Sequence, residues 1–373
     1  MRLCIVTVAT LSLISLPGCL VREPRNTPGD SNPRLVSPAP SPRELPIDPE
    51  VPHRVARPEA PALPDHVMSV TGEALESAGL PEETRLRYEA NLAAAQRAFA
   101  ENPTDLDATI WVGRRLAYLG RYLEAIAHYT EAMRAHPASP ELYRHRGHRF
   151  ITIRRFDLAI ADLEYATQLV AGQPDRVEAD GLPNARNIPT STLQTNVAYH
   201  LGLAHYLSGD FDGAAAAYAH CAALARNPDM LVATVAWQYA ALARAGRAEE
   251  AKRAVASVNP EWDIIENAAY HSLCLVYRGL YDADALLAAV RNQDDTTRLN
   301  RPTTLYGLSN HARVEGDDSK ADALCREIVE LNAWAAFGSI AAEVDLHRER
   351  EEAHEQRTDS TRSPAGDEES GRR

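Results

Sequence analysis

The sequence concentrates groups that could bind an anion in one short stretch, LYRHRGHRF, at residues 142–150. Five of its nine side chains are basic: Arg144, His145, Arg146, His148 and Arg149. Between residues 106 and 155 there are nine arginines and four acidic residues, whereas the whole chain has a formal net charge of −13. Guanidinium groups donate paired, charge-assisted hydrogen bonds to carboxylates and phosphates. The stretch is therefore a candidate anion-binding site.

Catalytic and metal-binding patterns have little support in this sequence. It contains no nucleophile motif around Ser or Cys, no HExxH and no phosphate-binding loop. His145 and His148 lack a third ligand at metal spacing. Cys221, Cys274 and Cys325 lie far apart and are expected to be buried thiols. We therefore expect no metal, no cofactor and no enzymatic activity. The third alternative for the function is an enzyme whose active site is assembled across a groove of the fold.

The first 18 residues are typical of a signal peptide, with Arg2 before an apolar run that is too short to span a membrane. The run ends in Leu16-Pro17-Gly18-Cys19, which resembles the bacterial lipobox except at Pro17. The resemblance implies cleavage before Cys19 and lipid attachment to its thiol. The absence of Asp after Cys19 favours the outer membrane, facing the periplasm. The alternative is an ordinary secretory signal with a chance Cys.

The folded part should be flanked by two segments that form no core. Residues 20–65 hold twelve of the 24 prolines, so 19–65 is predicted to be a disordered tether. Residues 347–373 are charged and are predicted to be a frayed helix end followed by a disordered tail.

Between these segments the sequence repeats with a period of 34 residues: Gly113 aligns with Gly147, and Ala125 with Ala159. This pattern resembles the tetratricopeptide repeat (TPR), in which small residues let two antiparallel helices approach closely. The resemblance implies an all-α helical solenoid of about five to six helix pairs over residues 66–346. The strings RHRGHR and DGLPNARNIPTSTLQ also resemble a group of bacterial TPR lipoproteins.

The period is interrupted at residues 174–194, where about 21 residues stand in place of a short turn. This insertion is either a binding loop or an ordered strap that packs on the solenoid. Leu182, Ile188 and Leu193 are the apolar residues that could pack if it is a strap.

In this repeat family the first helix of each pair lines a concave groove. The resemblance places seven residues there as partner- or anion-binding candidates, in an arrangement similar to the carboxylate clamps of the family: Arg114, Tyr118, Arg144, His148, Asn196, Tyr199 and Tyr206. The competing interpretation is internal pairing. Arg146 stands where the repeat usually buries Leu, so Asp162, Glu178 or Asp180 could hold it as a structural ion pair.

These observations predict a lipid-anchored, non-catalytic scaffold or adaptor that binds a protein or peptide partner in the groove. The alternative is a receptor for a small anionic ligand or a peptide carboxylate. The net charge of −13 argues against nucleic acid as the main partner.

Overall fold

The computed structural model describes residues 55–59, 62–76, 79–293 and 299–362. The predicted signal peptide, Cys19, most of the tether and the end of the tail lie outside these residues. Within them, helices are the main regular structure and two isolated β-bridges are present. No helix in this part of the chain is both long and apolar enough to cross a membrane.

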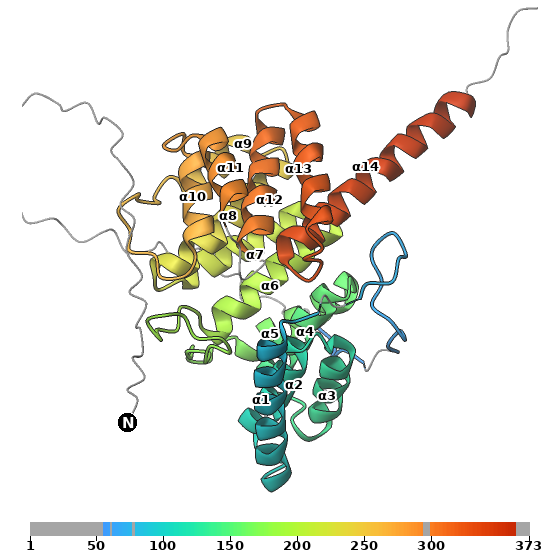
Figure 1. Cartoon of the computed structure of the whole chain (residues 1–373), viewed down its shortest axis with the longest axis vertical. Coiled ribbons are helices and arrows are strands. Elements are labelled where there is room, and N and C mark those ends of the chain that lie inside the picture. The colour runs from blue at the N-terminus through green and yellow to red at the C-terminus, as the bar shows by residue number, and fades with distance from the viewer. Residues whose placement is uncertain (1–54, 60–61, 77–78, 294–298, 363–373) are drawn as a thin grey trace, which may run out of the picture. The chain divides into compact units, whose positions relative to one another are not determined.

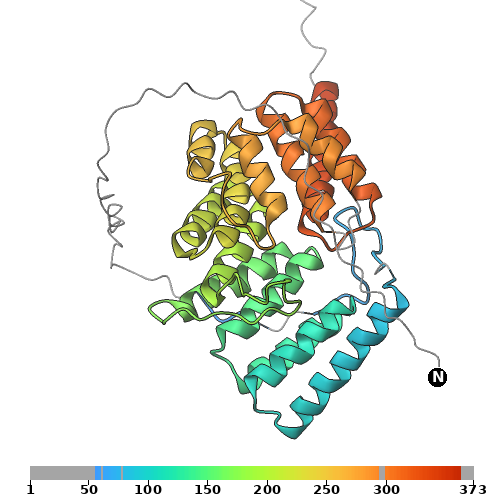
Figure 2. The ribbon, with the colours of Figure 1, turned by 60° about the vertical axis from the view of Figure 1, so that its left-hand side comes forward.

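Five antiparallel helix pairs form most of the body of the described chain (Figure 1). The pairs are α2 (Leu106–Tyr118) with α3 (Tyr122–Ala135), α4 (Pro140–Thr152) with α5 (Phe156–Val170), α6 (Leu193–Ser208) with α7 (Phe211–Leu224), α8 (Pro228–Arg244) with α9 (Ala248–Val255), and α12 (Asn300–Val314) with α13 (Asp318–Glu330). Between the last two of these pairs, α10 (Ala268–Tyr277) packs on α8 and α12, and α11 (Ala283–Asn292) packs on α12. A single helix, α1 (Glu82–Glu101), lies alongside α2 (Figure 2). The last helix, α14 (Phe337–Arg362), packs on α12 and α13.

Small residues set the approach of the two helices in the first three pairs. A Cβ on Gly113 would lie 2.2 Å from the Tyr129 ring, and one on Gly147 would lie 2.8 Å from Leu163. In the third pair, a Cβ on Gly202 would lie 2.9 Å from the ring of Tyr218. Such distances leave no room for a side chain, so glycine is required at these positions. The predicted register, with Gly147 at the α4–α5 contact, is confirmed.

The turn inside the second pair departs from the others. Gly120 takes φ +75° between α2 and α3, whereas Arg154, one repeat later, takes φ +63° between α4 and α5. A left-handed backbone is costly for a residue with a side chain. The Arg154 guanidinium is held in place: it donates to Glu343 of α14 at 2.5 Å and to the Trp334 carbonyl at 2.9 Å.

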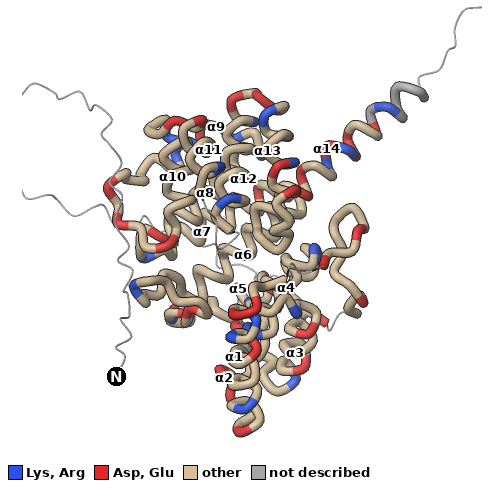
Figure 3. Tube along the Cα trace, viewed as in Figure 1, with Lys and Arg blue, Asp and Glu red and all other residues tan. Residues whose placement is uncertain are grey.

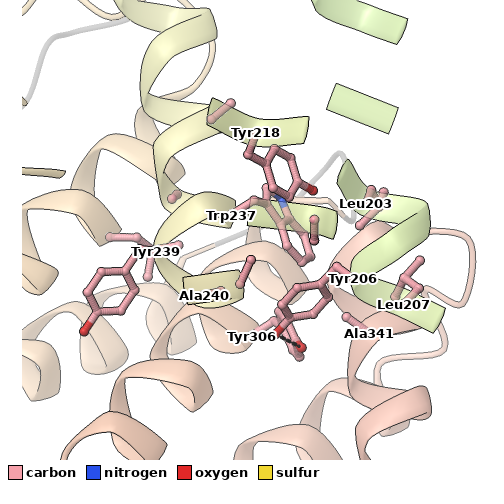
Figure 4. Packing of buried hydrophobic residues seen from close by; sticks show 14 of the residues in the cluster. Leu203, Tyr206, Leu207, Tyr218, Trp237, Tyr239, Ala240, Tyr306 and Ala341 are labelled. Atoms are coloured by element: carbon pink, nitrogen blue, oxygen red, sulfur yellow. Dashed lines mark hydrogen bonds between the residues drawn. The ribbon is translucent and has the colours of Figure 1, made fainter. Parts of the chain in front are cut away.

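The inner face of the later pairs is filled by the chain itself. Helix α12 contacts α8, and α14 contacts α6. Tyr206 of α6 and Tyr306 of α12 share a hydrogen bond of 2.7 Å beside the buried Trp237 (Figure 4). On α14, the buried Asp345 accepts hydrogen bonds from Tyr306 and Arg244. The groove expected along these helices is therefore closed.

Two predicted boundaries differ from the structure. Leu63 packs against the main core, and Arg57 donates hydrogen bonds to the Tyr143 hydroxyl and the Met133 carbonyl, so the end of the predicted tether is bound to the solenoid. The predicted tail begins inside α14, which continues to Arg362. Acidic and basic positions alternate along this helix (Figure 3). Charged residues of both signs support a solvated helix by pairing one turn apart, as His347 does with Glu351.

Candidate functional site

The insertion between α5 and α6 is a strap, which we define as residues 174–192 because α6 begins at Leu193. A β-bridge joins Val177 to Thr192 near the base of the strap. Its distal part is tied to the loop before α10. There Arg186 donates to both carboxylate oxygens of Asp263, at 2.6 and 2.7 Å, and Thr190 donates to Glu266.

Polar contacts hold the strap, in contrast to the apolar packing that the sequence suggested. Leu182 is 57% exposed and Ile188 is 48% exposed, so the prediction that they pack was wrong. Leu193 is buried, but it belongs to the first turn of α6. The strap crosses helical faces rich in hydrogen-bond donors, and its own carbonyls and carboxylates provide the acceptors.

The Glu178 carboxylate of the strap sits among donors from α4 and α6. Arg144 Nη2 lies 3.2 Å from Glu178 Oε1, and His145 Nε2 lies 3.4 Å from the same oxygen. Asn196 Nδ2 donates to Oε2 at 3.0 Å. Arg144 Nη1 also lies 2.9 Å from His145 Nδ1, which orients both side chains. We call Arg144, His145 and Asn196 the carboxylate seat.

The next strap residues are bound through their main chain. Arg114 Nη1 donates to the Ala179 carbonyl at 2.7 Å, and Arg115 Nη1 donates to the Gly181 carbonyl at 3.4 Å. Both guanidiniums lie over the Trp111 ring, 4.5 and 4.6 Å from its centroid, which restricts their motion.

Gly181 lies directly against α2. A Cβ on this residue would fall 1.5 Å from Tyr118 Oη and 2.7 Å from Arg114 Nη2. This approach excludes any side chain unless Tyr118 moves. The face of α2, α4 and α6 therefore holds the strap by three features: the carboxylate of Glu178, the carbonyl of Ala179, and the close approach of Gly181 to Tyr118.

Positive charge exceeds negative charge at this face. Arg114, Arg144 and Arg149 act together on the buried imidazole of His145, whose pKa burial and these charges hold well below its usual value. Burial also lowers the pKa of Arg144, against the opposing effect of Glu178. In the part of the chain that the structure describes, Arg149 forms no ion pair and rests 5.5 Å from the Tyr122 ring. Asp180 of the strap is a second carboxylate in this region: burial, Glu266 and Glu178 raise its pKa, against the opposing effect of Arg114.

The repeated helix pairs, their 34-residue period and their glycine contacts decide the architecture. The fold is a tetratricopeptide-repeat solenoid.

Comparison with known proteins adds two solved structures. The chain is similar to the crystal structure of YrrB, a TPR protein with an unusual peptide-binding site, at 14% identity and a TM-score of 0.37, covering 64% of this chain and 93% of that one. It is also similar to a chain in the structure of Naa15/Naa10 bound to HypK-THB, at 17% identity and a TM-score of 0.31, covering 66% of this chain and 36% of that one. No protein-family model matches, and no curated protein matches.

Within the tetratricopeptide solenoid, Arg146 has a structural position. Its Nε and Nη2 donate to the two oxygens of Asp162, each at 2.7 Å, and its Nη1 donates to Thr130 Oγ1 at 3.1 Å. The side chains of Arg146 and Asp162 are 2% and 0% exposed. The interpretation of Arg146 as a structural ion pair is confirmed, with Asp162 as the partner.

Four of the seven predicted groove residues converge on the strap and three do not. The four are Arg114, Tyr118, Arg144 and Asn196, and the strap covers them, whereas the prediction had them facing an open groove. The other three belong to the packed interior of the tetratricopeptide solenoid. His148 packs on Phe337, Tyr199 contacts Tyr270, and Tyr206 contacts Tyr306, because the inner face closes around α6.

Sequence reasoning missed three residues of this site. His145 was considered only as part of the basic stretch and as a metal ligand without a third partner, and Arg115 was only counted among the nine arginines of residues 106–155. Glu178 was weighed only as a partner for Arg146. The sequence does contain a signal for Glu178. This residue belongs to the acidic run EAD, residues 178–180, which lies in the long insertion that follows the basic stretch. In the described ranges, no group of three or more His, Cys, Asp or Glu side chains is placed to hold a metal ion.

Proposed function

We propose that the protein is a non-catalytic scaffold that binds an extended acidic segment of a partner protein on the face of α2, α4 and α6. One observation carries this proposal: that face already holds such a segment, the chain's own strap. Arginines contact carbonyl oxygens of the strap, which every peptide possesses, and the carboxylate seat contacts an acidic side chain. Recognition of main-chain and carboxylate groups together is the chemistry of peptide binding.

The arginines of the face favour an acidic partner. The strap places two carboxylates near them, Glu178 and Asp180, so a ligand that takes the strap's place would meet an attractive potential with two acidic groups of its own. Binding to such a face should weaken with added salt, because exposed charges are screened over about 8 Å at physiological ionic strength.

We further propose that the scaffold is lipid-anchored through Cys19 at the outer membrane, facing the periplasm. The lipobox-like sequence before Cys19 supports this location. The Cys19→Ser variant should move from the membrane fraction to the soluble periplasmic fraction. A variant that stays with the membrane after a high-salt wash would contradict the anchor.

The binding function is tested by cross-linking and affinity capture from solubilised membranes. Replacing Arg114 and Arg115 with Ala together should weaken capture of the partner at least about tenfold, since each charge-assisted contact contributes roughly 1–3 kcal/mol. Arg134→Ala is the matched control, because Arg134 is exposed and pairs only with Glu131 of its own helix. Equal capture by the double variant and by the control would refute this face as the binding surface.

A further inference from the structure

The strap occupies the face that the proposed function assigns to a partner, and it does so with a defined spacing. The carboxylate of Glu178 enters the carboxylate seat, the carbonyl of Ala179 meets Arg114, and the carbonyl of Gly181 meets Arg115. A side chain at the last position would displace the ends of Tyr118 and Arg114, so glycine is the residue that leaves both in place. The strap therefore displays the sequence that this face recognises.

We infer that the strap is an internal competitor whose segment 178–181, Glu-Ala-Asp-Gly, specifies the motif bound in the partner: an acidic residue followed three residues later by glycine. This inference rests on the proposed function and names the partner's chemistry. A partner segment with this motif makes the same contacts and therefore displaces the strap from the face.

The outer surface of the strap is consistent with a segment that leaves the solenoid. Val177 is 65% exposed and Leu182 is 57% exposed, so displacing the strap breaks little apolar packing of these side chains. The contacts of segment 178–181 are hydrogen bonds and an ion pair, which a second peptide with the same residues can make. The contacts of Arg186 with Asp263 and of Thr190 with Glu266 lie outside this segment and remain when it is displaced. Its base stays attached through the bridge between Val177 and Thr192.

An internal competitor lowers the apparent affinity for any ligand of the same face. If the strap occupies the face about 90% of the time, the apparent Kd of a competing peptide rises about tenfold, in proportion to the inverse of the open fraction. A variant with a loosened strap should therefore bind the same peptide about tenfold more tightly.

The first experiment measures binding of a labelled peptide with the sequence of residues 177–184, VEADGLPN, by fluorescence anisotropy. Gly181→Val in the full chain should push the strap tip away from Tyr118 and tighten peptide binding about tenfold relative to wild type. Ala185→Val, at an exposed strap position, is the matched control and should leave the affinity unchanged. Peptides with Gln in place of Glu, or with Val in place of Gly, should bind at least about tenfold more weakly to the Gly181→Val protein.

A second experiment needs no variant. Trypsin cleaves after Arg176 and Arg186, whose side chains are 61% and 48% exposed, and the peptide itself contains no tryptic site. Saturating peptide should accelerate cleavage after Arg186 several-fold, because displacing residues 178–181 loosens the strap on the N-terminal side of Arg186, while cleavage after Arg134 stays constant.

The outcomes separate this inference from the proposed function. A peptide that binds neither wild type nor Gly181→Val, or that tolerates Val in place of Gly, overturns the motif. Membrane capture of a partner that depends on Arg114 and Arg115 would still support the scaffold. Peptide binding with the expected preferences, but no captured partner, supports the motif and contradicts the scaffold role.

Discussion

Replacing Arg146 with Leu should destabilise the second helix pair severely. Arg146 donates two hydrogen bonds of 2.7 Å to Asp162, whose side chain is fully buried. Without the Arg146 guanidinium, the Asp162 carboxylate is still buried away from water but no longer accepts either hydrogen bond. Breaking one half of a buried ion pair typically costs about 3–5 kcal/mol. This is a large share of the roughly 5–15 kcal/mol by which domains are stable.

The double variant Arg146→Leu with Asp162→Val is the decisive comparison. It removes both charges and fills the site with apolar groups, so its unfolding free energy should lie within about 1.5 kcal/mol of wild type. Urea unfolding followed by circular dichroism at 222 nm measures both variants, and hydrogen exchange locates the loss in α4 and α5. The reasoning is refuted if Arg146→Leu alone costs less than about 1 kcal/mol, or if the double variant is less stable than that single variant.

Three further predictions concern packing, pH and thiol reactivity. Gly147→Leu should lose about 1–3 kcal/mol or more in urea unfolding, since its side chain would collide with Leu163; an unchanged midpoint would contradict the register. Three buried imidazoles have pKa values well below normal because burial disfavours their charge: His145, His148 and His200. As the pH is lowered, the unfolded chain takes up protons at these histidines before the folded chain does. The unfolding free energy should therefore decrease at pH values below about 6.5, by up to about 4 kcal/mol per pH unit. An unfolding free energy that stays constant from pH 7 to 5 would count against this. Burial raises the pKa of Cys221 to about 12 and that of Cys325 to about 11, so a thiol reagent followed by peptide mapping should label them only in urea.

Local periodicity was enough to predict the helix pairs, because each pair is specified by residues close in sequence. Gly113 and Tyr129 lie sixteen residues apart, and their contact follows from small and large side chains placed one helix apart. The same pattern recurs at Gly147 and Leu163. No knowledge of the rest of the chain is needed for either contact.

The site and the inner face depend on contacts between distant residues, which no local pattern specifies. Glu178 reaches Arg144 only because the strap turns back across two helices, and that path is fixed by Arg186 meeting Asp263, 77 residues later. Tyr206 was expected in a groove, but the curvature of the solenoid brings Tyr306 against it. The curvature of a solenoid is the sum of small rotations between neighbouring repeats, and this sum cannot be predicted from a single sequence.

The contact between Arg154 and Glu343 has a consequence for the order in which the protein is made. The two residues are 189 positions apart, and the helix that carries Glu343 is the last of the described chain. At about 5–20 residues per second, a ribosome adds that helix roughly 10–40 s after the turn at Arg154. During this interval Arg154 must keep its left-handed backbone conformation without the ion pair to Glu343. The second repeat therefore completes its folding only after Glu343 has been added, and termination of the chain before Glu343 would weaken a repeat that was translated long before.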